Sequence, residues 1–169
     1  MDKIMNKLLI ACMLASSAVA DEVLTRDERI VALTILGEAR GEGNTGMFAV
    51  GCVIQKRSSN RNLTPAQVCQ QSWQFSIWNA GKGKIKKERE LWHLWDSPSK
   101  MYARKLARYL CKDTMVLHDI TNSADHYCTL RTNPPWAFKT VRDKKTNKLI
   151  KVPVKPVKTI GNHKFYKLK

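Results

Sequence analysis

Two apolar helical segments, separated by a short stretch rich in glycine, constrain the fold of this chain most strongly. The first has a broad apolar face that continues to Ala39, built by Ile30, Val31, Leu33, Thr34 and Ile35. In the second, apolar or small residues recur at helical spacing at Met47, Val50, Gly51 and Ile54. Between them stand Gly41, Gly43 and Gly46. Because glycine disfavours helix, the sequence predicts two separate helices joined by a turn.

Capping residues and prolines indicate where the predicted helices begin. Thr25 followed by Glu28 forms a capping box for the first helix. The second is expected to begin at Asn44 or Thr45. Proline near the first helical position favours two more helices, from Thr64-Pro65 through Val68 and Cys69, and from Ser97-Pro98 to Cys111.

The C-terminal third predicts strands rather than helices. Residues 124–130 fit a short strand, and residues 136–141 and 148–152 flank a polar turn at 143–147, which predicts a β-hairpin. The hairpin is basic and contains Pro153 and Pro156, so an exposed or edge location is expected. The predicted fold class is therefore α+β, mostly helical, as one domain over residues 21–169 with a small β element near the C-terminus.

The first twenty residues have the pattern of a secretory signal peptide. Two lysines precede an apolar run from Leu8 to Leu14, and Ala18-Val19-Ala20 provides a small-residue cleavage site. A lipoprotein signal ending at Cys12 is the alternative, although little apolar sequence precedes that cysteine. No other stretch is apolar and long enough to cross a bilayer. We therefore expect a protein exported to the periplasm or the cell wall, with no transmembrane segment in its mature form.

The chain is strongly basic, with a formal net charge of +16. Such a charge favours polyanionic partners such as nucleic acid, anionic lipid or anionic wall polymers, although it can also serve solubility alone. Because the chain is expected to be exported, anionic envelope polymers are the predicted partners and nucleic acid is not.

Four cysteines remain after residue 20, and an even number in an oxidising compartment favours two disulfides. Three connectivities are possible. We expect the pairs Cys52–Cys69 and Cys111–Cys128, because each closes a short loop. Buried free thiols are the alternative.

Glu38 is the candidate catalytic residue. It stands at the end of the first predicted helix between Leu36 and Ala39, where apolar surroundings and the helix dipole both disfavour a negative charge. Both effects favour the protonated form that a general acid needs. Lysozyme-type enzymes place a lone glutamic acid in such surroundings to protonate the leaving oxygen of a glycosidic bond.

Motifs along nearly the whole chain resemble the spore-cortex-lytic (SleB-type) cell wall hydrolase family. They begin with Gly37-Glu38-Ala39-Arg40-Gly41-Glu42 and the helix Val53-Ile54-x-x-Arg57, and continue with Gln74-Phe75-Ser76, Ala124-Asp125-His126-Tyr127, Pro135-Trp136 and Ile160-Gly161-Asn162-His163-Lys164-Phe165-Tyr166. The resemblance departs from the family pattern at Cys128 and in the strongly basic segment 139–158.

The resemblance implies a lysozyme-like domain that cleaves peptidoglycan glycan strands next to N-acetylmuramic acid, as a muramidase or a lytic transglycosylase, without a cofactor. It also implies that Glu38 is the catalytic acid. A sugar-binding cleft needs aromatic faces and polar groups. The candidate substrate-binding residues are Glu42, Gln74, Phe75, Ser76, His126, Tyr127, Trp136, His163 and Tyr166.

Several of these assignments have alternatives. The aromatic candidates could equally be core residues, and Trp73, Trp78, Trp92 and Trp95 could belong to the core or to a cleft wall. Glu42, one helical turn after Glu38, could orient the acid, repel its charge or cap the next helix. Asp96 and Asp125 are further carboxylates, but neither is marked by a motif, so a mechanism with a single acid fits best.

Three other functions compete with glycan cleavage. A metal enzyme is disfavoured because the four histidines, at positions 93, 118, 126 and 163, form no spaced ligand pair. A wall amidase or peptidase would need a reactive thiol, and Cys128 beside His126 is the candidate pair. A non-catalytic basic module that binds the wall or nucleic acid is the third.

Overall fold

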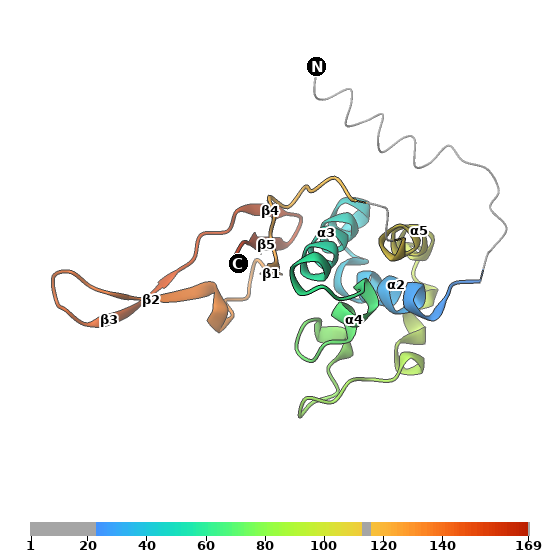
Figure 1. Cartoon of the computed structure of the whole chain (residues 1–169), viewed down its shortest axis with the longest axis horizontal. Coiled ribbons are helices and arrows are strands. Elements are labelled where there is room, and N and C mark those ends of the chain that lie inside the picture. Colours follow the sequence, from blue (N-terminus) through green and yellow to red (C-terminus); the bar gives the residue numbers. More distant parts are fainter. Residues whose placement is uncertain (1–22, 113–115, 169) are drawn as a thin grey trace, which may run out of the picture.

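The computed structural model describes residues 23–112 and 116–168. The predicted signal peptide and Cys12 lie outside the described residues. The fold class is α+β and mostly helical, as predicted: helices occupy the N-terminal two thirds, and short strands follow (Figure 1).

Helix α2 (Arg26–Ala39) is the central helix of the molecule and packs against α3 (Gly43–Arg61), α4 (Pro65–Gln70) and α5 (Lys100–Cys111). Every residue from Ile30 to Leu36 is buried. A helix that is buried on all sides needs apolar residues on all sides. This requirement explains the continuous apolar run that marked α2 in the sequence.

The predicted helix boundaries are largely confirmed. Thr25 accepts a hydrogen bond from the backbone N–H of Glu28 and returns one to its carboxylate, so the capping box is present. A second capping box, formed by Thr64 and Gln67, opens α4. Helix α3 begins at Gly43, one residue before the predicted start, and α5 begins at Lys100 rather than directly after Pro98.

Two 3₁₀ helices, which the sequence patterns did not predict, cover α2 from the segment between α4 and α5. They are η1 (Ser76–Trp78) and η2 (Glu88–Asp96). Trp78 lies in the core, and its indole N–H donates to the hydroxyl of Thr34 at 2.8 Å. Thr34 in turn donates to the carbonyl of Ile30 at 2.8 Å, so the buried hydroxyl is fully used.

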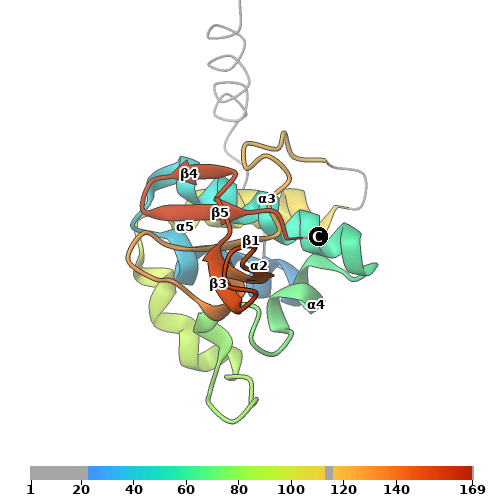
Figure 2. The same cartoon turned by 90° about the vertical axis from the view of Figure 1, so that its left-hand side faces the viewer.

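A three-stranded antiparallel sheet lies against α3, with strand order β1 (His126–Thr129), β5 (His163–Tyr166), β4 (Lys158–Ile160) (Figure 2). Strand β1 is shorter than the predicted 124–130, and β4 and β5 were not predicted. Phe165 anchors the sheet by packing on Ala49 and Val53 of α3. Since Cβ atoms alternate along a strand, Tyr127, His163 and Phe165 share the face that meets α3.

The predicted hairpin is confirmed as strands β2 (Phe138–Arg142) and β3 (Leu149–Pro153), preceded by the 3₁₀ turn η3 (Pro135–Ala137). Asp143 shapes its turn by accepting hydrogen bonds from the backbone N–H groups of Lys145 and Thr146. The hairpin extends away from the helices (Figure 1). Its base is closed by a 2.8 Å hydrogen bond from the N–H of Val154 to the carbonyl of Ala137.

Candidate active site

Glu38 lies in the last turn of α2, half-buried, and three hydrogen bonds hold its carboxylate. One oxygen, Oε1, accepts from the Ser76 hydroxyl at 3.1 Å and from the backbone N–H of Ile77 at 3.4 Å. The other oxygen accepts from the Tyr127 hydroxyl at 2.8 Å. The carboxylate is thus fixed between η1 and β1, two segments about fifty residues apart in the chain.

Gly37 allows η1 to come this close to α2. A Cβ atom at position 37 would lie 2.4 Å from the side chain of Ile77, closer than real contacts allow. Any larger residue would therefore push η1 outward and lengthen the bonds from Ser76 and Ile77 to Glu38. The glycine before the glutamate serves the position of the acid rather than the turn after the helix.

Tyr127 connects the sheet to Glu38. Its ring lies edge-on to His163, with centroids 5.2 Å apart, and near Phe165 at 5.7 Å. Burial raises the pKa of Tyr127 well above its usual value, and the nearby carboxylate of Glu38 adds to this shift. The phenol therefore keeps its proton and remains a hydrogen-bond donor to Glu38 at neutral pH.

Arg57 is a buried cation beneath the site, only 5% exposed. Its Nε donates to the carbonyl of Asp125 at 2.7 Å, and a terminal nitrogen donates to the carbonyl of Gln74 at 3.1 Å. The guanidinium carbon also lies 5.0 Å from the centre of the Phe75 ring. Burial lowers the pKa of Arg57, whereas Tyr127, Asp125 and Glu38 oppose that shift. Arg57 thus ties together the segments before Ser76 and Tyr127, the two side chains that hold Glu38.

Glu42 occupies the N-cap position of α3 but makes no cap hydrogen bond with its side chain. Its two oxygens accept instead from the backbone N–H of Asn162 at 2.8 Å and from the Asn162 side-chain amide at 3.0 Å. The backbone bond from Asn162 is the main reason that the pKa of Glu42 is lowered. We call this contact the Glu42–Asn162 clasp; it joins the start of α3 to the turn between β4 and β5.

The clasp requires glycine at position 161. Gly161 has φ +55°, and a Cβ atom there would lie 2.3 Å from Oε2 of Glu42. Both the left-handed backbone and the close approach exclude other side chains without a rearrangement.

The predicted substrate-binding residues divide between the two faces of the sheet. Ser76 and Tyr127 contact Glu38, and His163 lies beside Tyr127. The opposite face carries His126, Trp136 and Tyr166. The ring centroid of Trp136 lies 5.1 Å from that of His126 and 5.4 Å from that of Tyr166. Phe75 is buried in the core, and the backbone of Gln74 is held by Arg57.

Asp125 and His126 form a pair on that opposite side, with 3.0 Å between Oδ1 and Nδ1. Although burial opposes ionisation of Asp125, hydrogen bonds from His126 and from the N–H of Leu168 lower its pKa. The Cys128 thiol shares this face but donates to the carbonyl of Thr132. Among the described residues, no cluster of histidine, cysteine and acidic side chains is arranged to hold a metal ion.

The structure holds neither predicted disulfide: Cys52, Cys69, Cys111 and Cys128 are all present as thiols. Two of the thiols have neighbours other than their expected partners. Cys52 donates to the carbonyl of His118, whereas Cys69 lies near Thr34 and Cys111. Burial raises the pKa of Cys52 to about 11 and that of Cys69 to about 12.

The four tryptophans in question divide between core and surface. Trp78 is fully buried, Trp95 is half-buried against the core, and Trp73 and Trp92 are 66% and 59% exposed.

Sequence reasoning also left Arg57 out of the site. A signal for it existed, because Arg57 follows Val50, Val53 and Ile54 at helical spacing on a buried face, where a cation needs partners.

Comparison with known proteins gives one match. A family model described as Cell Wall Hydrolase matches residues 41–166. The match starts three residues after Glu38 and includes Ser76, Tyr127 and the Glu42–Asn162 clasp. No curated protein and no solved structure matches the chain. No helix in the described part of the chain has the length and apolar character needed to span a membrane.

Proposed function

This chain belongs to the cell wall hydrolase family, and from that premise we propose that it cleaves the glycan strands of peptidoglycan with Glu38 as its single general acid and base. The observation that carries the proposal is the set of three hydrogen bonds that fixes the Glu38 carboxylate between η1 and β1. A catalytic acid has to be held in one geometry, and this carboxylate is anchored at both oxygens.

The partners of Glu38 suit a group that gains and loses a proton. Ser76 and Tyr127 are hydroxyls, which can donate to a carboxylate or rotate to accept from a carboxylic acid. Other carboxylates nearby have different partners: Glu42 is engaged by Asn162, and Asp125 by His126 and Leu168. These engagements support a mechanism with one acid rather than with a carboxylate pair.

In the proposed reaction, protonated Glu38 donates its proton to the glycosidic oxygen next to N-acetylmuramic acid, and the C1–O bond breaks. The carboxylate that remains then accepts a proton from the attacking oxygen. If that oxygen belongs to water, the product is a reducing sugar. If it is the C6 hydroxyl of the same muramic unit, the product is an anhydro sugar, one water lighter, as in a lytic transglycosylase.

Glu38→Gln tests the proposal because glutamine keeps the shape and two acceptor contacts but cannot supply the proton. We expect turnover of purified peptidoglycan to fall by about 10²- to 10⁴-fold, with an unchanged thermal unfolding midpoint. Mass spectrometry of the released fragments measures the rate and separates the two products. Near-normal release by a folded Glu38→Gln protein would refute the assignment.

Two further variants sharpen the test. Tyr127→Phe keeps the ring and removes the donor to Glu38, so we expect a loss of about tenfold or more in turnover. Asp96→Asn, at an exposed carboxylate on η2, is the matched control and should turn over normally. A large loss in Asp96→Asn would show that a second carboxylate takes part.

We further propose that the basic segment 139–158 binds anionic envelope polymers, and that residues 1–20 direct export. The segment carries eight basic side chains against one acid, Asp143, whose carboxylate is used within the turn. Strands β2 and β3 are exposed along most of their length and extend away from the helices (Figure 1). An exposed cationic arm of this kind attracts polyanions at low ionic strength.

A further inference from the structure

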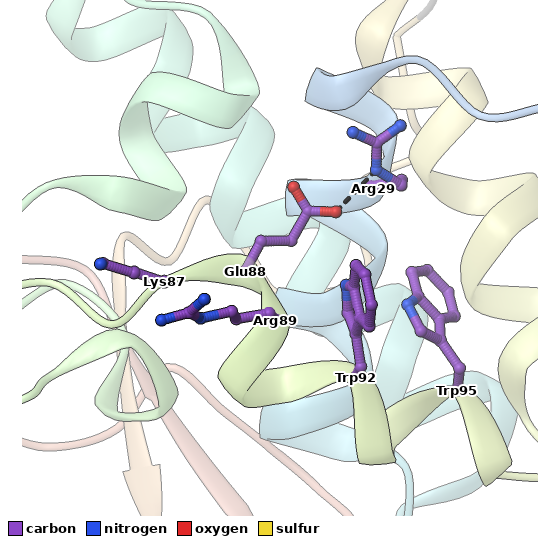
Figure 3. A pocket seen from close by; sticks show the side chains of 6 residues that line it. All are labelled: Arg29, Lys87, Glu88, Arg89, Trp92 and Trp95. Atoms are coloured by element: carbon purple, nitrogen blue, oxygen red, sulfur yellow. Dashed lines mark hydrogen bonds and ion pairs between the residues drawn. The ribbon is translucent and has the colours of Figure 1, made fainter.

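A hollow lies between the first turn of α2 and the 3₁₀ helix η2 (Figure 3). Its volume of about 630 Å³ is in the range of small-ligand sites. We call it the tryptophan pocket. It is lined by Arg29, Lys87, Glu88, Arg89, Trp92 and Trp95.

The three-residue repeat of η2 builds the aromatic wall of this pocket. In a 3₁₀ helix, residues three apart stand above one another, about 6 Å apart along the axis. Leu91 and Leu94 form the buried row, which fastens η2 to the core. The next row therefore places Arg89, Trp92 and Trp95 in line, and Figure 3 shows the two indoles side by side.

Trp92 is the exposed indole of this row, although apolar burial would favour the opposite, whereas Trp95 is half-buried against the core. Trp92 is 59% exposed, while Leu91 beside it is 3% exposed. Indole is the largest apolar side chain, and leaving it in water forgoes its burial energy. An exposed indole that lies beside a second, half-buried one at the wall of a hollow is typical of a surface that a ligand covers.

The charge of the tryptophan pocket is positive. Glu88 is the single carboxylate among its lining side chains, and it pairs with Nε of Arg29 at 2.6 Å. Arg29 is held further by a bond to the carbonyl of Leu24 at 3.0 Å. This pair neutralises Glu88, so Lys87 and Arg89 leave an excess of two positive charges among the side chains that line the hollow.

We infer that the tryptophan pocket is a second, non-catalytic binding site for wall glycan, which takes a sugar unit bearing a carboxylate. The C–H faces of a pyranose carry partial positive charge and stack on the negative faces of indole rings. A carboxylate on the same unit is complementary to Arg89 and Lys87. The inference rests on the proposed function for its ligand class, because exposed indoles beside cations also suit single-stranded nucleic acid.

The pocket is distinct from the Glu38 site. Arg29 precedes Glu38 by nine residues on α2, which places them about 14 Å apart along the helix axis. One sugar unit cannot contact both. A glycan strand bound in the tryptophan pocket would be retained by the enzyme while another unit occupies the Glu38 site.

The test measures binding of soluble glycan by calorimetry in a Glu38→Gln background, which prevents cleavage. The probes are glycan oligomers from which the stem peptides have been removed, so that each N-acetylmuramic acid unit carries a free carboxylate, and chitin oligomers of equal length, which carry none. We expect Trp92→Ala to raise the Kd of both by about three- to tenfold. Arg89→Gln should raise the Kd by about two- to fivefold for the peptide-free glycan oligomers and leave chitin binding unchanged.

Met101→Ala, at an exposed apolar residue of α5, and Lys105→Gln, at an exposed lysine of the same helix, are the matched controls and should bind like the parent. Unchanged affinity for the peptide-free glycan oligomers in a folded Trp92→Ala protein would overturn the inference. A Trp92-dependent affinity for a DNA oligonucleotide that exceeds the affinity for glycan would also overturn it. Activity in Glu38→Gln would instead refute the proposed function and leave the binding comparison valid.

Discussion

The Glu42–Asn162 clasp permits a quantitative prediction through Gly161→Ala. A Cβ atom at position 161 would collide with Oε2 of Glu42, so the carboxylate has to swing away and lose both bonds to Asn162. Those two partly exposed bonds contribute about 1–2 kcal/mol together. A non-glycine residue in the left-handed region costs about 1–2 kcal/mol more. We therefore expect Gly161→Ala to destabilise the protein by about 2–4 kcal/mol.

The two contributions separate in a double-mutant cycle with Glu42→Ala. In the parent, Glu42→Ala should cost about 1–2 kcal/mol, because it removes the two bonds. In the Gly161→Ala background, those bonds are already lost, so Glu42→Ala should cost close to nothing. Urea unfolding followed by circular dichroism gives the four free energies of unfolding.

Gly81→Ala provides the matched control. Gly81 also has a positive φ, of +84°, but a Cβ atom there would meet no atom within 4 Å. Gly81→Ala should show the cost of the backbone strain alone. Its effect on the free energy of unfolding should add to that of Glu42→Ala. Equal costs for Glu42→Ala in the parent and in Gly161→Ala would refute the collision with the clasp as the cause.

Two further predictions concern charge. Replacing Lys144, Lys145, Lys148 and Lys151 by glutamine should weaken pelleting with sacculi as strongly as raised salt does, since exposed charges are screened beyond about 8 Å at physiological ionic strength. Turnover of short soluble fragments should stay unchanged. If the variant loses this turnover but still pellets with sacculi, the hairpin belongs to the catalytic site. The buried thiols, with pKa values raised to about 11 for Cys52 and about 12 for Cys69, stabilise the fold fully below pH 8.5. Above that pH the thiols of the unfolded chain lose their protons first, so the free energy of unfolding measured with urea should fall by about 2 kcal/mol per thiol at pH 10. Cys69→Ala should reduce this dependence of stability on pH. A parent protein whose stability stays constant up to pH 10 would contradict the burial of the thiols.

The helices were predictable because their signals are local. Capping boxes at Thr25 and Thr64 act within three residues, and the apolar run of α2 reports burial on all sides. The η2 helix was missed because a three-residue period over nine residues is close to the helical period of 3.6. Strands β4 and β5 were missed because they are short and depend on pairing: β5 pairs with β1, which lies about thirty residues earlier, and β4 pairs with β5.

The candidate site was predictable in its members but not in their arrangement. Glu38, Ser76 and Tyr127 were named from the sequence and lie together in the structure. Neighbouring residues in β1 share a motif yet point to opposite faces, and the register that decides which face meets α3 is set by Phe165. Sequence alone therefore could not separate Tyr127 from His126. Which cysteines come near one another depends likewise on which helices pack together: Cys69 of α4 lies near Cys111 of α5.

The closed base of the β2–β3 hairpin makes this segment structurally separate from the rest of the fold. Since the N–H of Val154 bonds to the carbonyl of Ala137, the chain leaves the body and returns to it at one point. Insertions and deletions are tolerated where the two ends of a segment already meet. The length and sequence of residues 138–153 can therefore change without moving the two chain ends that join this hairpin to the rest of the fold.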